Sequence, residues 1–149
     1  MGKMVQKLGT ENIVTSNKED RDIHKTPGAC VVPGYGLTEW NKFQMRWPKT
    51  LKKYIPDMMK PFDCTGPYLK KLLLCASNTD LTSTCQYDEG SPLLCKKDGL
   101  VKLFGLTTGL SHARYCDQGL SLFTRVSTYY KWITRVSKKL QRENSDVVT

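Results

Sequence analysis

Six cysteines constrain this chain more than any other feature: Cys30, Cys64, Cys75, Cys85, Cys95 and Cys116. They are separated by 10 to 34 positions, and none forms the C-x2-C pair typical of structural zinc sites. Only His24 and His112 are available as histidine ligands, so the spacing favours disulfides over a metal site. Disulfides persist in oxidising compartments, which predicts an extracellular or secretory location. Six cysteines allow fifteen connectivities, and spacing alone does not choose between them.

The rest of the composition predicts one globular domain. The chain has 149 residues, of which 39% are hydrophobic and 25% are charged. No apolar run approaches the roughly 20 residues that a membrane-spanning helix needs, so no membrane association is expected. The first residues, MGKMVQKLGTENIV, lack the apolar core of a signal peptide. Since the cysteines indicate secretion, we interpret the chain as a fragment or a truncated product, and we expect no cofactor.

The net charge of +9 makes anionic partners a hypothesis, either an anionic glycan or an acidic protein. Residues 40–63 interleave aromatic with basic side chains, as single-stranded nucleic-acid grooves do. No RNA- or DNA-binding motif accompanies them, so we do not expect nucleic acid as a partner. The alternative is a strand whose apolar residues pack inward while its lysines face water, and we prefer it.

Local patterns divide the chain into three parts. Residues 1–28 are polar and without periodicity, and we interpret them as an exposed connector that ends in the Pro27-Gly28 turn. From Ala29 a short apolar strand runs into a glycine-rich turn. Further along, Asp98-Gly99 predicts a tight hairpin turn, and residues 100–106 are expected to alternate between apolar and polar positions along a strand.

The last element is predicted from periodicity alone. One apolar stripe of a helix is formed by Tyr129, Trp132, Ile133, Val136 and Leu140. Ser127 is the expected N-cap, and residues 142–149 are expected to fray. The exposed side carries a set of cations that we regard as a possible anion contact: Lys131, Arg135, Lys138, Lys139 and Arg142.

The stretch from Cys85 to Cys95, CQYDEGSPLLC, resembles the nucleophile loop of trypsin-like serine proteases, which reads C-x-G-D-S-G-G-P-L. Other segments resemble the same family in the same order. CVVPGYG at 30–36 is similar to C-x-V-x-G-W-G, LCAS at 74–77 to the end of the family's next disulfide loop, and VSTYYKWI at 126–133 to V-S-x-Y-x-x-W-I. TTG at 107–109 departs from the family's S-W-G substrate edge.

This resemblance implies an all-β fold for residues 29–141: a single six-stranded antiparallel Greek-key barrel with a C-terminal helix. It is the second half of the family's two-barrel fold, and residues 1–28 would be a remnant of the first half. The resemblance also implies three disulfides, namely Cys30–Cys95, Cys64–Cys75 and Cys85–Cys116.

The resemblance places altered residues at the catalytic centre. Glu89 stands where the family has its nucleophilic serine, and Tyr87 stands at an oxyanion-hole glycine. Asp88 is retained, and it either points to solvent or accepts local backbone hydrogen bonds. Ser83 stands at the base of the primary specificity pocket.

The family's catalytic histidine and aspartate come from the first barrel, which does not precede Ala29 here. We do not assign the histidine role to His24 or His112. We do not expect Asp88 and Glu89 to act as a carboxylate pair in acid–base catalysis, because adjacent residues in a turn point in different directions.

The preferred interpretation is therefore a non-catalytic protease homologue, a pseudoenzyme that acts as a binding or regulatory module. The alternatives are a serine-type endopeptidase, if the sequence is part of a longer active chain, and a truncated product without selected activity.

Overall fold

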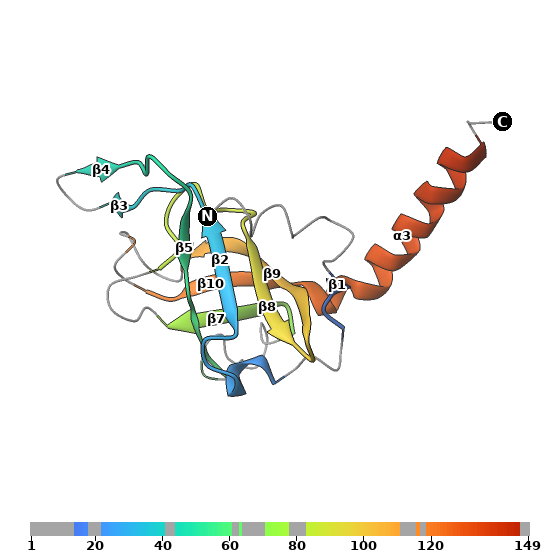
Figure 1. Ribbon diagram of the computed structural model, residues 1–149, viewed down its shortest axis with the longest axis horizontal. Coiled ribbons are helices and arrows are strands. Elements are labelled where there is room, and N and C mark those ends of the chain that lie inside the picture. Colours follow the sequence, from blue (N-terminus) through green and yellow to red (C-terminus); the bar gives the residue numbers. More distant parts are fainter. Residues whose placement is uncertain are drawn as a thin grey trace.

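The computed structural model describes residues 14–17, 22–40, 44–60, 63, 71–77, 83–110, 116 and 119–146. Nearly all regular structure is β, followed by one long helix (Figure 1). The early elements are β1 (Val14–Thr15), the 3-10 turn η2 (Ile23–Lys25), β2 (Cys30–Gly34), β3 (Glu39–Trp40), β4 (Met45–Arg46), β5 (Lys52–Tyr54) and β6 (Asp57–Met58). The later ones are β7 (Leu73–Ser77), β8 (Pro92–Lys97), β9 (Leu100–Leu110), β10 (Ser121–Arg125) and α3 (Val126–Asp146).

The main sheet curls into a closed barrel. Its strand order is β5-β2-β8-β9-β10-β7-β6, and all of these neighbours are antiparallel. The two end strands, β5 and β6, are separated only by Ile55 and Pro56, so they are two halves of one bent strand. Proline cannot donate a ladder hydrogen bond, which suits Pro56 to the bend. Counted this way, the barrel has six strands in a Greek-key order, and the predicted fold is confirmed.

The hairpin between β8 and β9 follows the prediction from its sequence. Asp98 has φ 53° and Gly99 has φ 76°, the pair of positive angles that a two-residue type I′ turn requires. The long strand β9 that follows then pairs with both β8 and β10.

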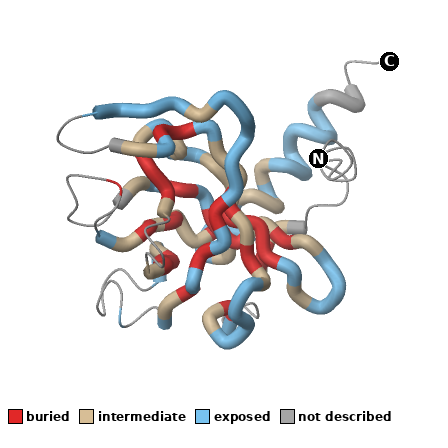
Figure 2. Tube along the Cα trace, turned by 60° about the vertical axis from the view of Figure 1, so that its left-hand side comes forward, coloured by how far each residue is buried: buried red, intermediate tan, exposed pale blue. Residues whose placement is uncertain are grey.

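The interior of the barrel is a single apolar cluster, seen as the buried segments of the strands in Figure 2. Phe104, Phe123 and Leu93 are its largest fully buried members. Tyr54 of β5 is also buried, and its hydroxyl donates to the Ser77 carbonyl of β7 at 2.9 Å. Burial is the main cause that raises the pKa of Tyr54 above its ordinary value of 10.0; a hydrogen bond with Ser121 opposes this shift, and nearby Asp57 adds to it.

The strand predicted for residues 100–106 is formed as part of β9, but its polar residue does not face outward. Lys102 lies on the same inward face as Phe104 and is buried, whereas Leu100 and Leu106 are exposed. The two-residue period of the strand forces this outcome, because Phe104 occupies the core and Lys102 precedes it by two positions. The Lys102 ammonium lies 3.8 Å from the Asp98 carboxylate at the hairpin turn.

The segment before Ala29, predicted as an exposed connector, contributes to the fold. β1 pairs in parallel with β9. Ile23 is buried in the barrel core because it is the one aliphatic side chain of its stretch, while Asp22 and residues 25–28 are exposed. The prediction holds for Asp22 and residues 25–28, and it is wrong for Ile23 and for Ser16, which is buried beside β9.

Helix α3 projects away from the barrel (Figure 1). It begins at Val126, so Ser127 lies inside the first turn and is not the N-cap, because β10 runs directly into the helix. It continues to Asp146, so residues 142–146 are helical rather than frayed. The predicted apolar stripe is largely uncovered: Trp132 is 56% exposed and Leu140 is 53% exposed. No helix within the described part of the chain is long and apolar enough to cross a bilayer.

Candidate functional site

The site that the sequence singles out is the turn from Cys85 to Ser91, which we call the centre loop. Two consecutive turns shape it, with the Asp88 amide donating to the Cys85 carbonyl at 3.2 Å and the Ser91 amide to the Asp88 carbonyl at 2.9 Å. The Gly90 amide donates to the Thr107 carbonyl at 2.8 Å, and the Thr107 amide to the Ser91 carbonyl at 2.9 Å. The loop is therefore attached to β9 immediately before β8 begins.

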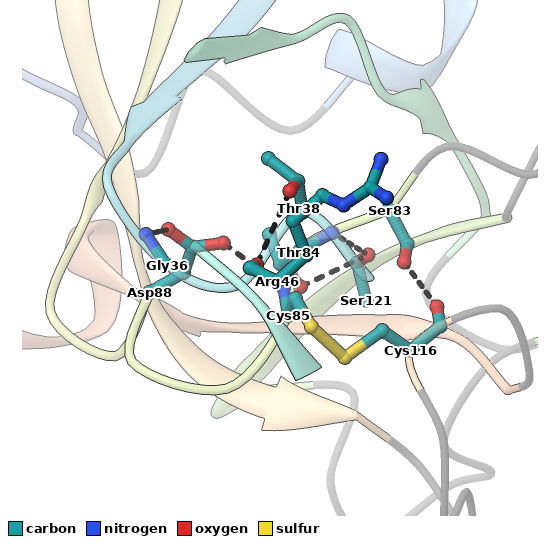
Figure 3. The surroundings of a disulfide bond; sticks show 9 residues. All are labelled: Gly36, Thr38, Arg46, Ser83, Thr84, Cys85, Asp88, Cys116 and Ser121. Carbon is teal, nitrogen blue, oxygen red and sulfur yellow. Dashed lines mark hydrogen bonds between the residues drawn. A yellow bond between two sulfur atoms is a disulfide. The ribbon is translucent and has the colours of Figure 1, made fainter. Parts of the chain in front are cut away.

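The Asp88 carboxylate holds the centre loop from inside. One oxygen accepts the Gly36 amide at 2.8 Å and the other accepts the Cys85 amide at 3.0 Å (Figure 3). Of the two alternatives for Asp88, local backbone hydrogen bonding is therefore the one observed. Charge-assisted bonds of this kind are stronger than neutral ones, so Asp88 fixes the loop against the turn after β2.

The turn after β2 is glycine-rich because the Asp88 carboxylate occupies the space of two side chains. A Cβ atom at Gly34 would overlap the Asp88 Oδ1, and one at Gly36 would lie 2.5 Å from the Asp88 Cγ. Both distances are too short for a real side chain. Glycine at 34 and 36 is thus a packing requirement of Asp88.

Two of the predicted disulfides are formed, Cys30–Cys95 between β2 and β8 and Cys85–Cys116 at the start of the centre loop. Leu37 packs with Cys85 and Cys116 in a small buried cluster, and the Leu37 amide donates to the Gln86 carbonyl at 3.0 Å. Cys75 is disulfide-bonded as well; its predicted partner, Cys64, lies outside the described residues.

Ser83, the predicted base of the specificity pocket, is engaged by the backbone. Its hydroxyl donates to the Cys116 carbonyl. Next to it, the Thr84 hydroxyl and amide both bond to the buried Ser121 hydroxyl of β10, at 3.1 and 3.2 Å. Figure 3 shows these bonds around the disulfide. Ser83 supplies no charge for recognising a substrate.

Tyr87 takes a backbone conformation that favours glycine. Its φ is 71°, in the left-handed region, and its side chain is 64% exposed. The ring lies against Trp47, with the ring centroids 4.8 Å apart and the planes tilted by 36°. Trp47 is itself 56% exposed, so the prediction that the apolar side chains of 40–63 pack inward is wrong for Trp47, although Tyr54 and Met58 are buried in the core as predicted. The reason is that β4 belongs to a separate two-stranded ribbon with β3, outside the barrel.

Glu89 directly follows Asp88 in the chain; Glu89 is exposed, whereas Asp88 is half-buried. The adjacent carboxylates therefore face different surroundings, as expected for neighbours in a turn, and no shared proton site arises between them. Among the described residues, neither the Tyr87 amide nor the Glu89 amide has a hydrogen-bond partner. The loop keeps these two backbone donors while its side chains differ from those of a serine hydrolase.

Of the two histidines, only His24 lies within the described part of the chain, and it is away from the centre loop. His24 lies in η2, at the opposite end of β2 from Gly36, with a buried Nδ1 that has no hydrogen-bond partner among the described residues. His112 lies outside the described residues.

The cations predicted as an anion contact are all exposed on α3. Arg135, Lys138, Lys139 and Arg142 line one shallow hollow together with Glu143. Lys131 continues the same side of the helix toward the barrel. These residues form a second candidate site, remote from the centre loop in sequence.

Sequence reasoning missed Trp47. The signal was indirect: a tyrosine at a position where the family has glycine leaves a bulky ring that needs a neighbour. Nothing in residues 40–63 pointed to Trp47 as that neighbour.

Comparison with known proteins gives one family. The family model described as Trypsin matches residues 5–133. Chymotrypsin-like elastase family member 1 from Canis lupus familiaris is 32% identical over 114 residues, which cover 72% of this chain and 43% of the relative. The protein of the same name from Homo sapiens is 31% identical over 114 residues, with the same coverage. The chain thus spans less than half the length of these relatives.

Proposed function

Because the chain belongs to the trypsin family, we propose that it is a non-catalytic member of that family, acting as a binding or regulatory module. The observation that carries the proposal is Glu89 at the position that the family motif assigns to the nucleophile. The flanking residues of the motif, Cys85, Asp88, Pro92 and Leu93, keep their spacing, so the alignment of Glu89 is fixed from both sides.

The chemistry of the family requires a hydroxyl at this position. Acyl transfer in trypsin-like enzymes begins when histidine takes the serine proton and the freed oxygen attacks the carbonyl. A carboxylate at neutral pH has no proton to give, and it is a weak nucleophile toward an amide. Glu89 therefore supports binding rather than cleavage.

The aromatic pair supports the same proposal. Tyr87 stands at the position of an oxyanion-hole glycine, and Trp47 lies against it. Two large rings at this place take up volume beside the two unpartnered amides of the centre loop. We infer that they hinder the approach of a substrate carbonyl to those donors.

The disulfides favour an extracellular or secretory location for this module. The elements of the family motif that this chain keeps hold the loop, through Asp88 and the Cys85–Cys116 bond.

Labelling with a fluorophosphonate probe tests the proposal, because the probe reacts only with an activated serine. We expect no labelling and no hydrolysis of peptide substrates by the purified oxidised protein. The matched control is active pancreatic elastase at the same concentration. Stoichiometric labelling, or hydrolysis that the probe inhibits, would overturn the proposal.

A serine-type endopeptidase is the second candidate, favoured by the chymotrypsin-like elastases among the relatives and by their greater length. The missing groups would then come from a first barrel in a longer chain. Fusing the unaltered sequence to such a barrel should give no hydrolysis under our proposal. The variant Glu89→Ser/Tyr87→Gly in the same fusion is the matched control, and activity of the unaltered fusion would favour the second candidate.

A further inference from the structure

We propose that the basic face of α3 binds a sulfated glycan chain. This inference rests on the proposed function, because it names the partner class of a binding module. The site consists of five cations, which we call the α3 cation stripe: Lys131, Arg135, Lys138, Lys139 and Arg142. It is separate from the centre loop and uses none of its residues.

The spacing of the α3 cation stripe places all five charges on one side of the helix. Relative to Lys131 they stand at i+4, i+7, i+8 and i+11. At 3.6 residues per turn these positions fall within an arc of about 100°, and at 1.5 Å per residue they extend over about 16 Å. A straight row of this kind matches a linear polyanion better than a single compact anion.

The stripe is accessible and little neutralised. All five side chains are exposed, on a helix that projects from the barrel (Figure 1). Helix α3 has only two acidic residues, Glu143 and Asp146, both at its C-terminal end. The Glu143 carboxylate lies 3.6 Å from the Lys139 ammonium, and both side chains are mostly exposed, so a polyanion competes with a weak pair.

The stripe is not a feature carried by the family match. The match ends at residue 133, whereas Arg135, Lys138, Lys139 and Arg142 all lie beyond it. These four residues line the shared hollow on the helix. Two of them are arginines, whose planar guanidinium groups bind oxyanions in a bidentate manner.

The apolar stripe of α3 makes a membrane the main competing partner. It is centred about 130° away from the cations around the helix, and a helix lying in a membrane interface buries such a face while its Lys and Arg side chains stay near the headgroups. The anionic lipids that attract cations lie in the cytoplasmic leaflet, whereas the disulfides favour an oxidising compartment. The charge of the stripe therefore favours a sulfated glycan.

Nucleic acid fits the stripe less well than a glycan does. Single-strand binders place aromatic rings beside their cations. On α3, Tyr129 lies about 135° around the helix from the centre of the cation stripe and Trp132 about 75° from it, so the stripe has one ring beside it and not the row of rings that such binders use. The disulfides also place the protein in the oxidising compartments where sulfated glycans occur.

Size-defined heparin oligosaccharides test the proposal on the full chain, by calorimetry and by elution from heparin resin. We expect Arg135→Gln/Lys138→Gln/Arg142→Gln to weaken binding by about tenfold or more and to flatten its salt dependence, because three phosphate-like contacts are lost. The matched control, Lys52→Gln/Lys53→Gln/Lys60→Gln, removes three exposed lysines elsewhere and should change the affinity by less than about twofold. Circular dichroism confirms that both variants keep their fold.

Three results would overturn the proposal. One is equal weakening by the two triple variants, which would mean attraction to net charge alone. Another is tighter binding to phosphatidylserine vesicles than to heparin, with loss on Trp132→Ala. The third is tighter binding to single-stranded DNA. The fluorophosphonate assay on the same preparation distinguishes failure of the glycan proposal from failure of the proposed function. A protein that neither binds heparin nor is labelled remains a non-catalytic homologue with another partner.

Discussion

The centre loop and helix α3 differ in how they are held. The centre loop has little regular structure, yet a disulfide, an inward carboxylate and pairing with β9 fix it from three directions. Helix α3 is regular over 21 residues, but it projects from the barrel (Figure 1) and leaves Trp132 and Leu140 more than half exposed to solvent. The irregular centre loop is therefore anchored on several sides, whereas the regular helix α3 is largely surrounded by solvent.

This difference separates the scaffold from the chemistry. In the centre loop, the residues that hold the backbone match the family motif, whereas the residues at the reactive positions do not. In α3, the part beyond the family match carries four of the five cations of the stripe. We conclude that stability and recognition are located in different regions, and substitutions in each should affect different measurements.

The largest effect is expected from Cys85→Ser/Cys116→Ser. This bond closes a loop with a sequence separation of 31, and its removal should lower the free energy of unfolding by about 2–4 kcal/mol. Urea denaturation measures the change, and mass spectrometry checks that the remaining cysteines keep their pairing. A loss below about 1 kcal/mol would mean that Asp88 and the β9 pairing hold the loop without the disulfide.

Asp88→Asn should give the next largest loss. The amide of asparagine can accept from only one of the two backbone donors, Gly36 or Cys85, and presents its own N–H to the other. We expect the free energy of unfolding to fall by about 1–3 kcal/mol. The matched control is Glu89→Gln, the same chemical change at the exposed neighbour, which should stay within about 0.5 kcal/mol. Equal effects at both positions would contradict the anchoring role of Asp88.

Much of the fold could be predicted because its signals are local or covalent. The Asp98-Gly99 turn was readable from two residues, and the position of α3 from its apolar period. The barrel and the pairs Cys30–Cys95 and Cys85–Cys116 followed from motif order.

Other features could not be predicted because they depend on contacts between distant segments. Lys102 faces the barrel interior because it lies two positions before Phe104 on the same face of β9. The local sequence does not show that Phe104 decides which face of the strand turns inward. Asp88 binds Gly36 across 52 positions. Trp47 meets Tyr87 only once the β3–β4 ribbon is placed. At the candidate site, residue identities were therefore available from the sequence, but their partners were not.

A double-mutant cycle on Trp47→Leu and Tyr87→Leu tests the ring contact over the centre loop. Aromatic pairs contribute about 0.5–1.5 kcal/mol beyond burial, and the exposure of both rings places this pair at the lower end. Leucine at position 87 still places a side chain on a residue with positive φ, so the backbone strain is kept and the cycle isolates the ring contact. Trp132, with the same 56% exposure as Trp47, is the matched control. Its cycle with Tyr87 should show no coupling, and equal coupling in the two cycles would contradict the contact.

The smallest effect is expected from Leu140→Ala in α3. A buried leucine costs about 2–5 kcal/mol on truncation, but Leu140 is 53% exposed, so the loss should stay below about 0.5 kcal/mol. Denaturation at two protein concentrations, tenfold apart, is the measurement. Leu93→Ala, at a fully buried position of β8, is the control and should reach the full cost of a core cavity. A loss above 2 kcal/mol that grows with protein concentration would mean that a second copy covers the apolar stripe in solution. Helix α3 would then be held as firmly as the centre loop, and the contrast between the two regions would fail.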